Sequence, residues 1–350
     1  MLPPTNFRHL RIRLVPNPTY QVEPVTQSFG IRTLPSNYLD VKLLSIKTSR
    51  IFDLRVFIAL LGPLLWGTTY ATVSAFFADW SPYALAAWRA LPAGILLLLV
   101  KPSLPKISEV PTLLIIGFIN ITLFFSLLFA SAMQLPSALV GVGMITLPVI
   151  GLVVVILVHK NQPSTIQILS AVILLFCSSY LFSSSKSDIS VSSVLYLIAA
   201  MAVLIFGSII TKSAMKKVDW WKLLTWKLIF GGIMLLPFAY WQQYLSGSHY
   251  PDPFSLSFSQ LAALIWLIIG VTSVSYGAYV YSIPRISTSE LSFFGTLNPI
   301  LAMVLGATVM GDDFSAVQIS IMVVMISSNL AAQLYERRLN QRSEQTIISY

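Results

Sequence analysis

Residues 83–94, with the sequence YALAAWRALPAG, and residues 221–232, with the sequence WKLLTWKLIFGG, decide the fold. Each stretch begins with an aromatic residue, places a tryptophan directly before a cation, and ends on glycine in the same register. The two cations are Arg89 and Lys227, and each stands in a largely apolar run. One structural unit therefore occurs twice in this chain.

The composition around these stretches is that of a membrane protein. Of the 350 residues, 56% are hydrophobic and 10% are charged, with a mean hydropathy of +0.78, whereas soluble domains carry about 25% charged residues. One water-facing globule cannot bury that much apolar surface, so soluble enzymes, nucleic-acid-binding proteins and disordered chains are excluded. The only cysteine, Cys177, excludes a disulfide scaffold.

Ten apolar runs are each long enough to cross a bilayer as a helix. Helices are expected because every backbone polar group in lipid needs a partner within the chain. The predicted fold is therefore all-α and integral to the membrane, with ten transmembrane helices. The runs are 56–77, 83–100, 111–131, 137–158, 166–183, 192–211, 220–240, 259–281, 289–309 and 315–335.

Positive charges divide unequally between the two sides that ten spans define. Of the 22 Lys and Arg residues, 18 fall on the side that carries both termini, and the opposite loops hold only Lys186. This bias predicts cytoplasmic termini. It also accounts for the formal net charge of +9, so no nucleic-acid partner is expected. The predicted location is the cell membrane, as a multi-pass protein, with the bacterial inner membrane favoured.

The ends of the chain fall outside the spans. Residues 1–55 are a basic tail rich in Pro, Arg, Ser and Thr, without the apolar segment of a secretory signal. Three interpretations of residues 1–45 stay open: a flexible cytoplasmic tail, an extension from a misplaced start codon, or an organelle transit segment. Residues 336–350 are expected to form a cytoplasmic C-terminal tail.

The repetition continues along both halves of the chain. Further matches are Trp66-Gly67 with Phe206-Gly207, Thr146-Leu147-Pro148 with Leu297-Asn298-Pro299, and Ser164 and Gln167 with Ser315 and Gln318. They predict two five-helix repeats, residues 56–183 and 191–335. Because five is odd, the second repeat crosses the membrane in the opposite sense, and inverted repeats are typical of secondary transporters.

The order and spacing of these motifs resemble a known family. The segments Leu64-Leu65-Trp66-Gly67-Thr68-Thr69-Tyr70 and Ala87-Trp88-Arg89-Ala90-Leu91-Pro92-Ala93 are similar to those of EamA-type transporters in the drug/metabolite transporter superfamily. The resemblance covers most of residues 56–335. It implies ten helices, cytoplasmic termini and a central cavity lined by spans one, three, four, six, eight and nine. It also implies export of amino acids, metabolites or drugs.

The resemblance is incomplete where spans four and nine end. The family often has a Gly-Glu pair there, whereas this chain has Lys160-Asn161 and Gly311-Asp312. The first pair loses the acid and the second keeps one. The family's cargo varies widely, so the resemblance implies transport without naming a substrate.

Arg89 and Lys227 are the strongest candidates for substrate binding. Each lies about seven residues into its span, Arg89 from the predicted external end and Lys227 from the cytoplasmic end. A cation at mid-helix costs about 2.5–3.5 kcal/mol to insert and usually faces protein or water. One interpretation is that the pair attracts a carboxylate or other anionic group. The other is that both side chains extend to the headgroups, about 10 Å away along the helix.

Aromatic residues at helical spacing are candidates for a pocket wall. Trp66 and Tyr70 share a face of span one and are expected to line the pocket. Tyr276 is a further candidate on span eight. Tyr279, near the end of the same span, is expected in the interfacial aromatic belt.

Span nine carries three polar or aromatic residues at four-residue intervals, namely Glu290, Phe294 and Asn298. Phe294 and Asn298 are candidate substrate contacts, and Asn298 is also suited to a helix–helix hydrogen bond. Glu290 lies near the cytoplasmic end, where pairing with Arg285 is the alternative to a functional role.

Pro148 and Pro299 each remove one backbone hydrogen bond at matched positions. They are predicted to kink their helices, either as bending points of two gating helices or as fixed bends. These two alternatives stay open.

Cofactor chemistry has no support in the sequence. No Gly-rich phosphate loop ending in Gly-Lys-Ser/Thr occurs, and His9, His159 and His249 form no metal cluster with Cys177. Neither a cofactor nor a metal is expected.

These features favour a secondary transporter, acting as an exporter of small organic metabolites such as amino acids, related compounds or drugs. Its expected partners are a small-molecule substrate and the lipid bilayer, and a homodimer stays open. One alternative is a lipid or lipid-linked-sugar flippase with the same fold. The other, an integral-membrane enzyme acting on lipid-linked substrates, is disfavoured because acids such as Asp79, Asp219 and Glu109 are scattered over both sides.

Overall fold

The computed structural model describes residues 54–154, 156, 163–185, 188–246, 255–283, 285–286 and 294–348. Every regular element within these ranges is helical, which confirms the predicted all-α class. The first half contains α2 (Leu54–Gly67), α3 (Thr69–Phe76), α4 (Pro82–Val100), η1 (Ile107–Glu109), α5 (Val110–Gly117), η2 (Phe118–Leu123), α6 (Phe124–Ala132), α7 (Ser137–Ile145), α8 (Leu147–Val154) and α9 (Thr165–Ser183). The second half contains α10 (Val191–Ala214), α11 (Trp220–Ser246), α12 (Phe258–Ile265), η4 (Trp266–Val274), α13 (Ser275–Ser282), α15 (Leu297–Thr308) and α16 (Ala316–Ile348).

Most of the predicted spans appear as long apolar helices. Within the described ranges, eight helical segments are long and apolar enough to cross a membrane. Two shorter apolar segments, Ser137–Val153 and Leu297–Thr308, fall where spans four and nine are predicted. Both of those predicted spans, 137–158 and 289–309, include residues outside the described ranges. The count of ten therefore stays a prediction.

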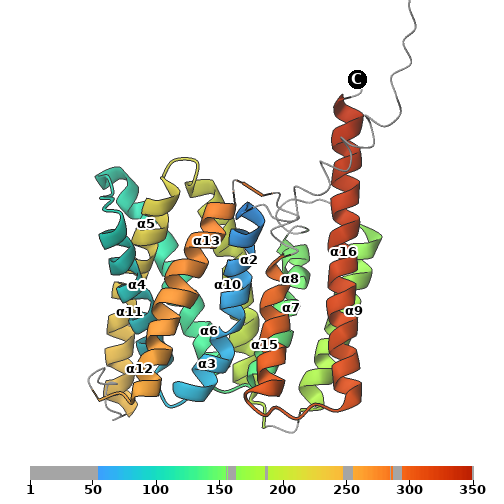
Figure 1. Cartoon of the computed structure of the whole chain (residues 1–350), viewed down its shortest axis with the longest axis horizontal. Coiled ribbons are helices and arrows are strands. Elements are labelled where there is room, and N and C mark those ends of the chain that lie inside the picture. Colours follow the sequence, from blue (N-terminus) through green and yellow to red (C-terminus); the bar gives the residue numbers. More distant parts are fainter. Residues whose placement is uncertain are drawn as a thin grey trace, which may run out of the picture. The chain divides into compact units, whose positions relative to one another are not determined.

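Helices of the two halves pack against each other throughout the described bundle. The most extensive contacts join α4 to α11 and α7 to α15, and α6 also packs on α10, α2 on α13 and α9 on α16. Figure 1 shows α4 and α11 together at one side and α9 with α16 at the other. The largest buried cluster lies around α4 and includes Tyr70, Phe125 and Leu228 from three other helices.

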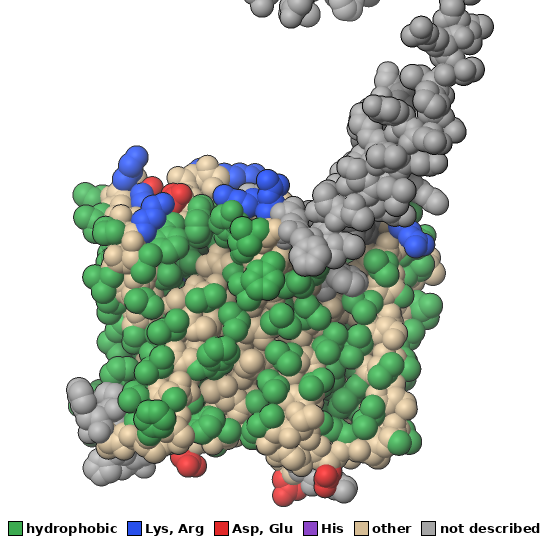
Figure 2. All heavy atoms as spheres, viewed as in Figure 1, with side chains coloured by type: hydrophobic (Ala, Val, Ile, Leu, Met, Phe, Trp, Pro, Cys, Tyr) green, Lys and Arg blue, Asp and Glu red, His purple; other side chains and the backbone are tan. Residues whose placement is uncertain are grey.

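The surface of the bundle is apolar along its sides and charged at its ends. Figure 2 shows hydrophobic side chains over the side of the helices and Lys and Arg gathered at one end. We call this the basic end; its exposed cations include Lys101, Lys106, Lys212, Lys216, Lys217 and Arg285. At the opposite end lie the loop residues Asp79, Asp188, Asp312 and Asp313. Such a surface suits a protein whose sides face lipid.

Several spans are irregular, a feature that the hydropathy pattern did not predict. Helix α2 gives way to α3 at Thr68, and α7 gives way to α8 at Thr146. Each threonine hydroxyl donates to the carbonyl three residues earlier, at 2.8 Å for Thr68 and 2.6 Å for Thr146. Side-chain bonds of this kind compete with the helix ladder. The third and eighth spans each contain a π-helical segment, η2 and η4.

The last helix runs further than its apolar run. Span ten was predicted over 315–335, yet α16 continues to Ile348. The segment after residue 335 contains neither glycine nor proline and is rich in Glu, Arg and Gln, which favour helix. The predicted C-terminal tail of 336–350 is therefore helical over most of its length.

Candidate substrate site at the helix crossing

The site is built on the crossing of α4 and α11, where glycines bring the two helices together. A Cβ atom placed on Gly94 would lie 2.7 Å from Ile229 Cγ1, and one on Gly232 would lie 2.9 Å from the backbone nitrogen of Leu91. Neither position has room for a side chain, so the helices touch backbone to backbone. Arg89 precedes Gly94 by five residues, and Lys227 precedes Gly232 by the same interval.

Arg89 is buried inside the bundle, with 1% of its surface exposed. Its Nε donates to Thr272 Oγ1 at 2.6 Å, and one terminal nitrogen donates to the carbonyl of Val271 at 3.5 Å. The guanidinium carbon lies 4.5 Å from the centroid of the Phe125 ring, a cation–π distance. Its other terminal nitrogen, Nη1, has no hydrogen-bond partner in the described part of the chain.

Lys227 is also buried, with 4% of its surface exposed. Its Nζ lies 4.9 Å from the centroid of the Tyr276 ring. Neither Lys227 nor Arg89 pairs with a carboxylate among the described residues. A side chain that extended to the headgroups would remain exposed on the bundle surface, so the burial of both cations speaks against that interpretation.

Tyr276 is the centre of an aromatic cluster between the two cations. Its ring lies 5.0 Å from Trp66 in an edge-to-face arrangement and 6.3 Å from Phe125. Tyr279 also contacts Trp66, with 5.1 Å between ring centroids and the rings tilted by 53°. The prediction that Tyr279 belongs to the interfacial belt is therefore wrong: it lies three residues after Tyr276 and shares its inward face.

Tyr70 and Asn298 extend the cluster toward α15. The Tyr70 side chain, 2% exposed, interacts with the side-chain amide of Asn298 and lies within electrostatic range of Arg89. Asn298 is 8% exposed, and its Oδ1 has no hydrogen-bond partner in the described ranges. The backbone of α15 is close here, because a Cβ on Gly67 would lie 2.8 Å from the Asn298 carbonyl.

Several buried polar atoms in this region lack partners among the described residues. They are Arg89 Nη1, Asn298 Oδ1 and the indole nitrogen of Trp66. A buried polar group without a hydrogen bond costs about 1–3 kcal/mol. Two of the three atoms are donors, and they accompany two cations, so the local chemistry suits an anion with additional polar groups.

The structure brings together six of the sequence-predicted site residues, namely Trp66, Tyr70, Arg89, Lys227, Tyr276 and Asn298. Phe294 is half-buried one turn before Asn298. Pro148 and Pro299 follow the helix breaks at Thr146 and Thr296. Glu290 lies outside the described residues, and Arg285 donates to the Tyr281 carbonyl at 2.7 Å.

Sequence reasoning missed Phe125 and Thr272, which hold Arg89. Thr272 lies in the π-helical segment η4, where its hydroxyl also donates to the Leu267 carbonyl at 2.7 Å. A π-helical turn leaves carbonyls free for other partners and is frequent at functional sites. No pattern in the sequence marks this segment, because its apolar residues read as an ordinary span.

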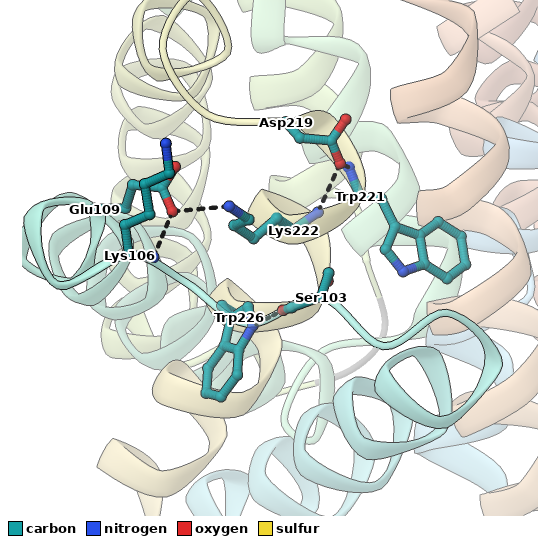
Figure 3. A network of polar contacts seen from close by, with 7 residues as sticks. All are labelled: Ser103, Lys106, Glu109, Asp219, Trp221, Lys222 and Trp226. Carbon is teal, nitrogen blue, oxygen red and sulfur yellow. Dashed lines mark hydrogen bonds and ion pairs between the residues drawn. The ribbon is translucent and has the colours of Figure 1, made fainter.

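A polar clamp fastens α11 to the segment that follows α4 at the basic end (Figure 3). Lys222 Nζ lies 2.9 Å from Glu109 Oε2, and the same carboxylate oxygen accepts the Lys106 backbone N–H at 2.8 Å. The indoles of Trp221 and Trp226 donate to the carbonyls of Lys101 and Ser103, at 3.0 and 2.6 Å. The clamp ties the segment between α4 and α5 to the first turns of α11.

The described bundle also contains a groove. Its volume is about 460 Å³, and it lies among α2, α4, α11, η4 and α13. Nearly all of its lining is apolar, with Leu97, Trp220 and Ile269 among the wall residues. It does not contain the two buried cations. In the described ranges no group of three or more His, Cys, Asp or Glu is arranged to hold a metal ion.

A bundle of apolar helices that buries cations, donors and aromatic rings at its centre is the construction of a polytopic membrane transporter. The chain belongs to the EamA-like transporter family, whose sequence profile matches residues 54–184 and again residues 191–331. This confirms the resemblance on which the sequence analysis relied.

Individual relatives agree with this assignment. The chain is 27% identical over 285 residues to Protein PecM of Dickeya dadantii, covering 80% of this chain and 93% of that protein. It is 24% identical over 293 residues to a WAT1-related chloroplastic protein of Arabidopsis thaliana, covering 73% and 63%. It is 26% identical over 249 residues to the uncharacterized transporter YvbV of Bacillus subtilis, covering 66% and 80%.

The fold also has a counterpart among solved structures. A crystal structure matches 81% of this chain and 98% of its own, with a TM-score of 0.59 and 17% sequence identity. At that identity the match concerns the fold alone. The family match identifies the chain as a multi-pass membrane transporter.

Proposed function

We propose that this protein is a secondary transporter that exports small organic metabolites carrying a carboxylate or other anionic group, amino acids and related compounds foremost. The observation that carries the proposal is the pair of buried cations, Arg89 and Lys227, without an acidic partner among the described residues. A buried charge is retained only where it is paired or functional. A substrate anion supplies the missing partner.

Each part of the cluster has a role in binding this substrate. Arg89 is held by Thr272 and Phe125 with Nη1 free, so it presents a fixed donor to the anion. The rings of Trp66 and Tyr276 provide a flat apolar wall for the remainder of the cargo. Asn298 offers an acceptor for an ammonium or hydroxyl group.

We place the ten helices in two inverted repeats that rock around this site. Matched contacts at the α4–α11 crossing support the repeat. Gly94 meets Ile229, and Gly232 meets Leu91, which are corresponding residues when Arg89 is aligned with Lys227. A pseudo-two-fold axis through the crossing generates such reciprocal pairs. Pro148 and Pro299, each next to a helix break, are the proposed bending points.

The basic end is proposed to face the cytoplasm, with both termini there. On this orientation Arg89 lies toward the outside of the crossing and Lys227 toward the cytoplasm. The membrane proposed is the bacterial inner membrane, in line with the two bacterial relatives. For residues 1–45, the chloroplastic relative keeps the transit-segment alternative open.

A lipid or lipid-linked-sugar flippase is the second candidate, and one observation favours it. The groove among α2, α4, α11, η4 and α13 has an almost entirely apolar lining. An acyl chain fits such a surface, but the groove lacks the cations and unpaired donors that the central cluster offers. A small polar metabolite therefore accounts for more of the structure.

An export comparison tests the proposal. Spent medium is profiled for small metabolites from cells producing the wild type, cells producing Lys227→Ala at equal membrane abundance, and empty-vector cells. We expect an anionic or zwitterionic compound enriched by the wild type and reduced about tenfold or more by Lys227→Ala, since a charge-assisted hydrogen bond contributes about 1.5–3 kcal/mol. Equal export by the variant would remove Lys227 from the site. Lipid scrambling by the reconstituted protein without metabolite export would favour the flippase.

A further inference from the structure

We propose that Asp312 is the positioning residue of the external gate: it closes the seam between α7 and α15 by capping the N-terminus of α7, and external protons favour this closed state. The proposal rests on the transport cycle and orientation above. It concerns the end of the bundle opposite the basic end. The central site makes no use of Asp312.

The turn after α15 places Asp312 at the seam between α7 and α15. Gly311 has a φ of 71°, a conformation that glycine adopts without the penalty other residues incur. The chain reverses there, with the Met310 N–H donating to the Leu305 carbonyl at 3.2 Å and the Asp312 N–H donating to the Gly306 carbonyl at 3.0 Å. The carboxylate is thereby folded back over the last turn of its own helix, toward α7.

Helix α7 lacks a cap of its own. Pro136 occupies its N-cap position and provides no side-chain hydrogen bond, and the buried hydroxyl of Ser137 has no partner among the described residues. The first N–H groups of a helix need acceptors and favour negative charge. Asp312 Oδ2 accepts the N–H of Ala138 at 3.4 Å, across 174 residues of sequence.

Gly306 makes this contact sterically possible. A Cβ on Gly306 would lie 2.7 Å from Asp312 Oδ2 and 2.8 Å from Ala138 Cβ. The absence of a side chain therefore lets α7, α15 and the carboxylate meet at one point. Because α7 and α15 form one of the two most extensive contacts between the halves, a cap at their end controls whether the seam is open to the outside.

The surroundings of Asp312 determine the direction of the pH effect. Burial raises the pKa of its carboxyl above the ordinary value, and the Ala138 hydrogen bond opposes this shift. Helix α7 presents Ser137 and Ala138 and α15 presents Gly306, none of them ionisable. Of the neighbouring acids, Asp313 and Asp188 are exposed. Lys186, the one loop cation predicted at this end, lies outside the described residues.

Proton binding by Asp312 and closure of the gate are linked, and this linkage gives the sign of the pH effect. When the gate opens, the Asp312 carboxyl returns to water and regains its ordinary pKa, so the closed state binds the proton more tightly. Acidification of the outside therefore favours closure, through the pH range between the ordinary and the raised pKa. A proton that arrives after cargo release closes the external seam and returns the protein toward the cytoplasm-facing state. The rate of export should therefore depend on the pH outside the cell.

Cysteine accessibility tests the gate without any substrate. In a Cys177→Ser background, Val142→Cys places a reporter on the buried face of α7, one turn below Ala138. An impermeant maleimide applied to intact cells reports opening. Asp312→Asn keeps the shape and acceptor of the protonated carboxyl, Asp312→Ala removes the cap, and Asp313→Asn is the matched control at an exposed neighbouring acid.

We expect labelling of the Asp312→Ala protein about tenfold faster than that of Asp312→Asn, with the ratio of the two rates independent of pH. Because the reactive thiolate fraction falls in acid for every variant, each rate is divided by that of Asp312→Asn at the same pH. This ratio should fall toward one for the wild type and for Asp313→Asn as the medium is acidified. Equal rates for Ala and Asn, or a wild-type ratio that rises in acid, would overturn the proposal. If labelling follows these expectations while no metabolite is exported, the gate stands and the cargo proposal falls. If the reagent reacts only from the cytoplasmic side, the assigned orientation falls and the external gate with it.

Discussion

Two lysines of α11, five residues apart, differ in their burial and in their charge partners. Lys222 lies at the basic end, where its Nζ is 2.9 Å from Glu109 Oε2 and 16% of its side chain is exposed. Lys227 is 4% exposed and has an aromatic ring in place of a carboxylate. Lys222 therefore forms a structural ion pair, and its charge already has a partner within the chain. Lys227 has no carboxylate partner among the described residues, and we propose that the cargo supplies one.

Arg89 belongs with Lys227 in this comparison, and its substitution should have the largest effect. Arg89→Gln retains a donor but loses the charge, so transport of an anionic cargo should fall about 10- to 150-fold, the equivalent of 1.5–3 kcal/mol for a charge-assisted hydrogen bond. Uptake into proteoliposomes, with equal amounts of folded protein, measures this. A neutral analogue of the cargo should lose much less.

Lys222→Gln is the matched control for that experiment, since it removes a cation from the same helix crossing without touching the central cluster. Its transport rate should stay within about threefold of the wild type, because an ion pair near the surface contributes about 0–1 kcal/mol. A loss as large as that of Arg89→Gln would mean that the helix crossing, and not the buried charge, limits transport.

The packing of α4 on α11 can be tested by comparing a glycine at their crossing with a glycine that has free space around it. Gly232→Ala places a methyl group 2.9 Å from backbone atoms of Leu91 and should lower stability by about 1–3 kcal/mol. Gly277→Ala has no atom within 4 Å of the new Cβ and should be neutral or stabilising, because alanine favours helix. Thermal unfolding in detergent distinguishes the two variants. Equal melting temperatures would show that α4 and α11 separate easily.

The sequence predicted eight of the described apolar helices and the two cations within them, because these depend on local composition. Apolar runs set where the spans lie, and the repeated Trp-cation pair singled out Arg89 and Lys227. Their pairing state was not predictable, because it depends on which helices are neighbours. Glu109 meets Lys222 across 113 residues of sequence.

Local irregularities escaped prediction for a related reason. The segments η2 and η4 read as ordinary apolar helix, and their wider turns arise where side chains such as Thr272 bond backbone carbonyls. Tyr279 was misassigned because its position near the end of a span indicates depth, whereas its ring contact with Trp66 is set by the packing of α13 on α2.

The smallest expected effect concerns Glu109, and it completes the contrast between the two lysines. Glu109→Gln breaks the pair with Lys222 and weakens the bond to the Lys106 N–H. Because both side chains are partly exposed, the coupling in a double-mutant cycle with Lys222→Gln should stay below about 1 kcal/mol and shrink with added salt. Transport should be unchanged.

Lys227→Met should behave in the opposite way, with transport reduced and the melting temperature unchanged or raised, since a buried unpaired ammonium is replaced by an apolar chain of similar length. A melting temperature that falls for Lys227→Met as much as for a core deletion would show that Tyr276 alone stabilises the cation, and the case for an anionic cargo would lose its main support.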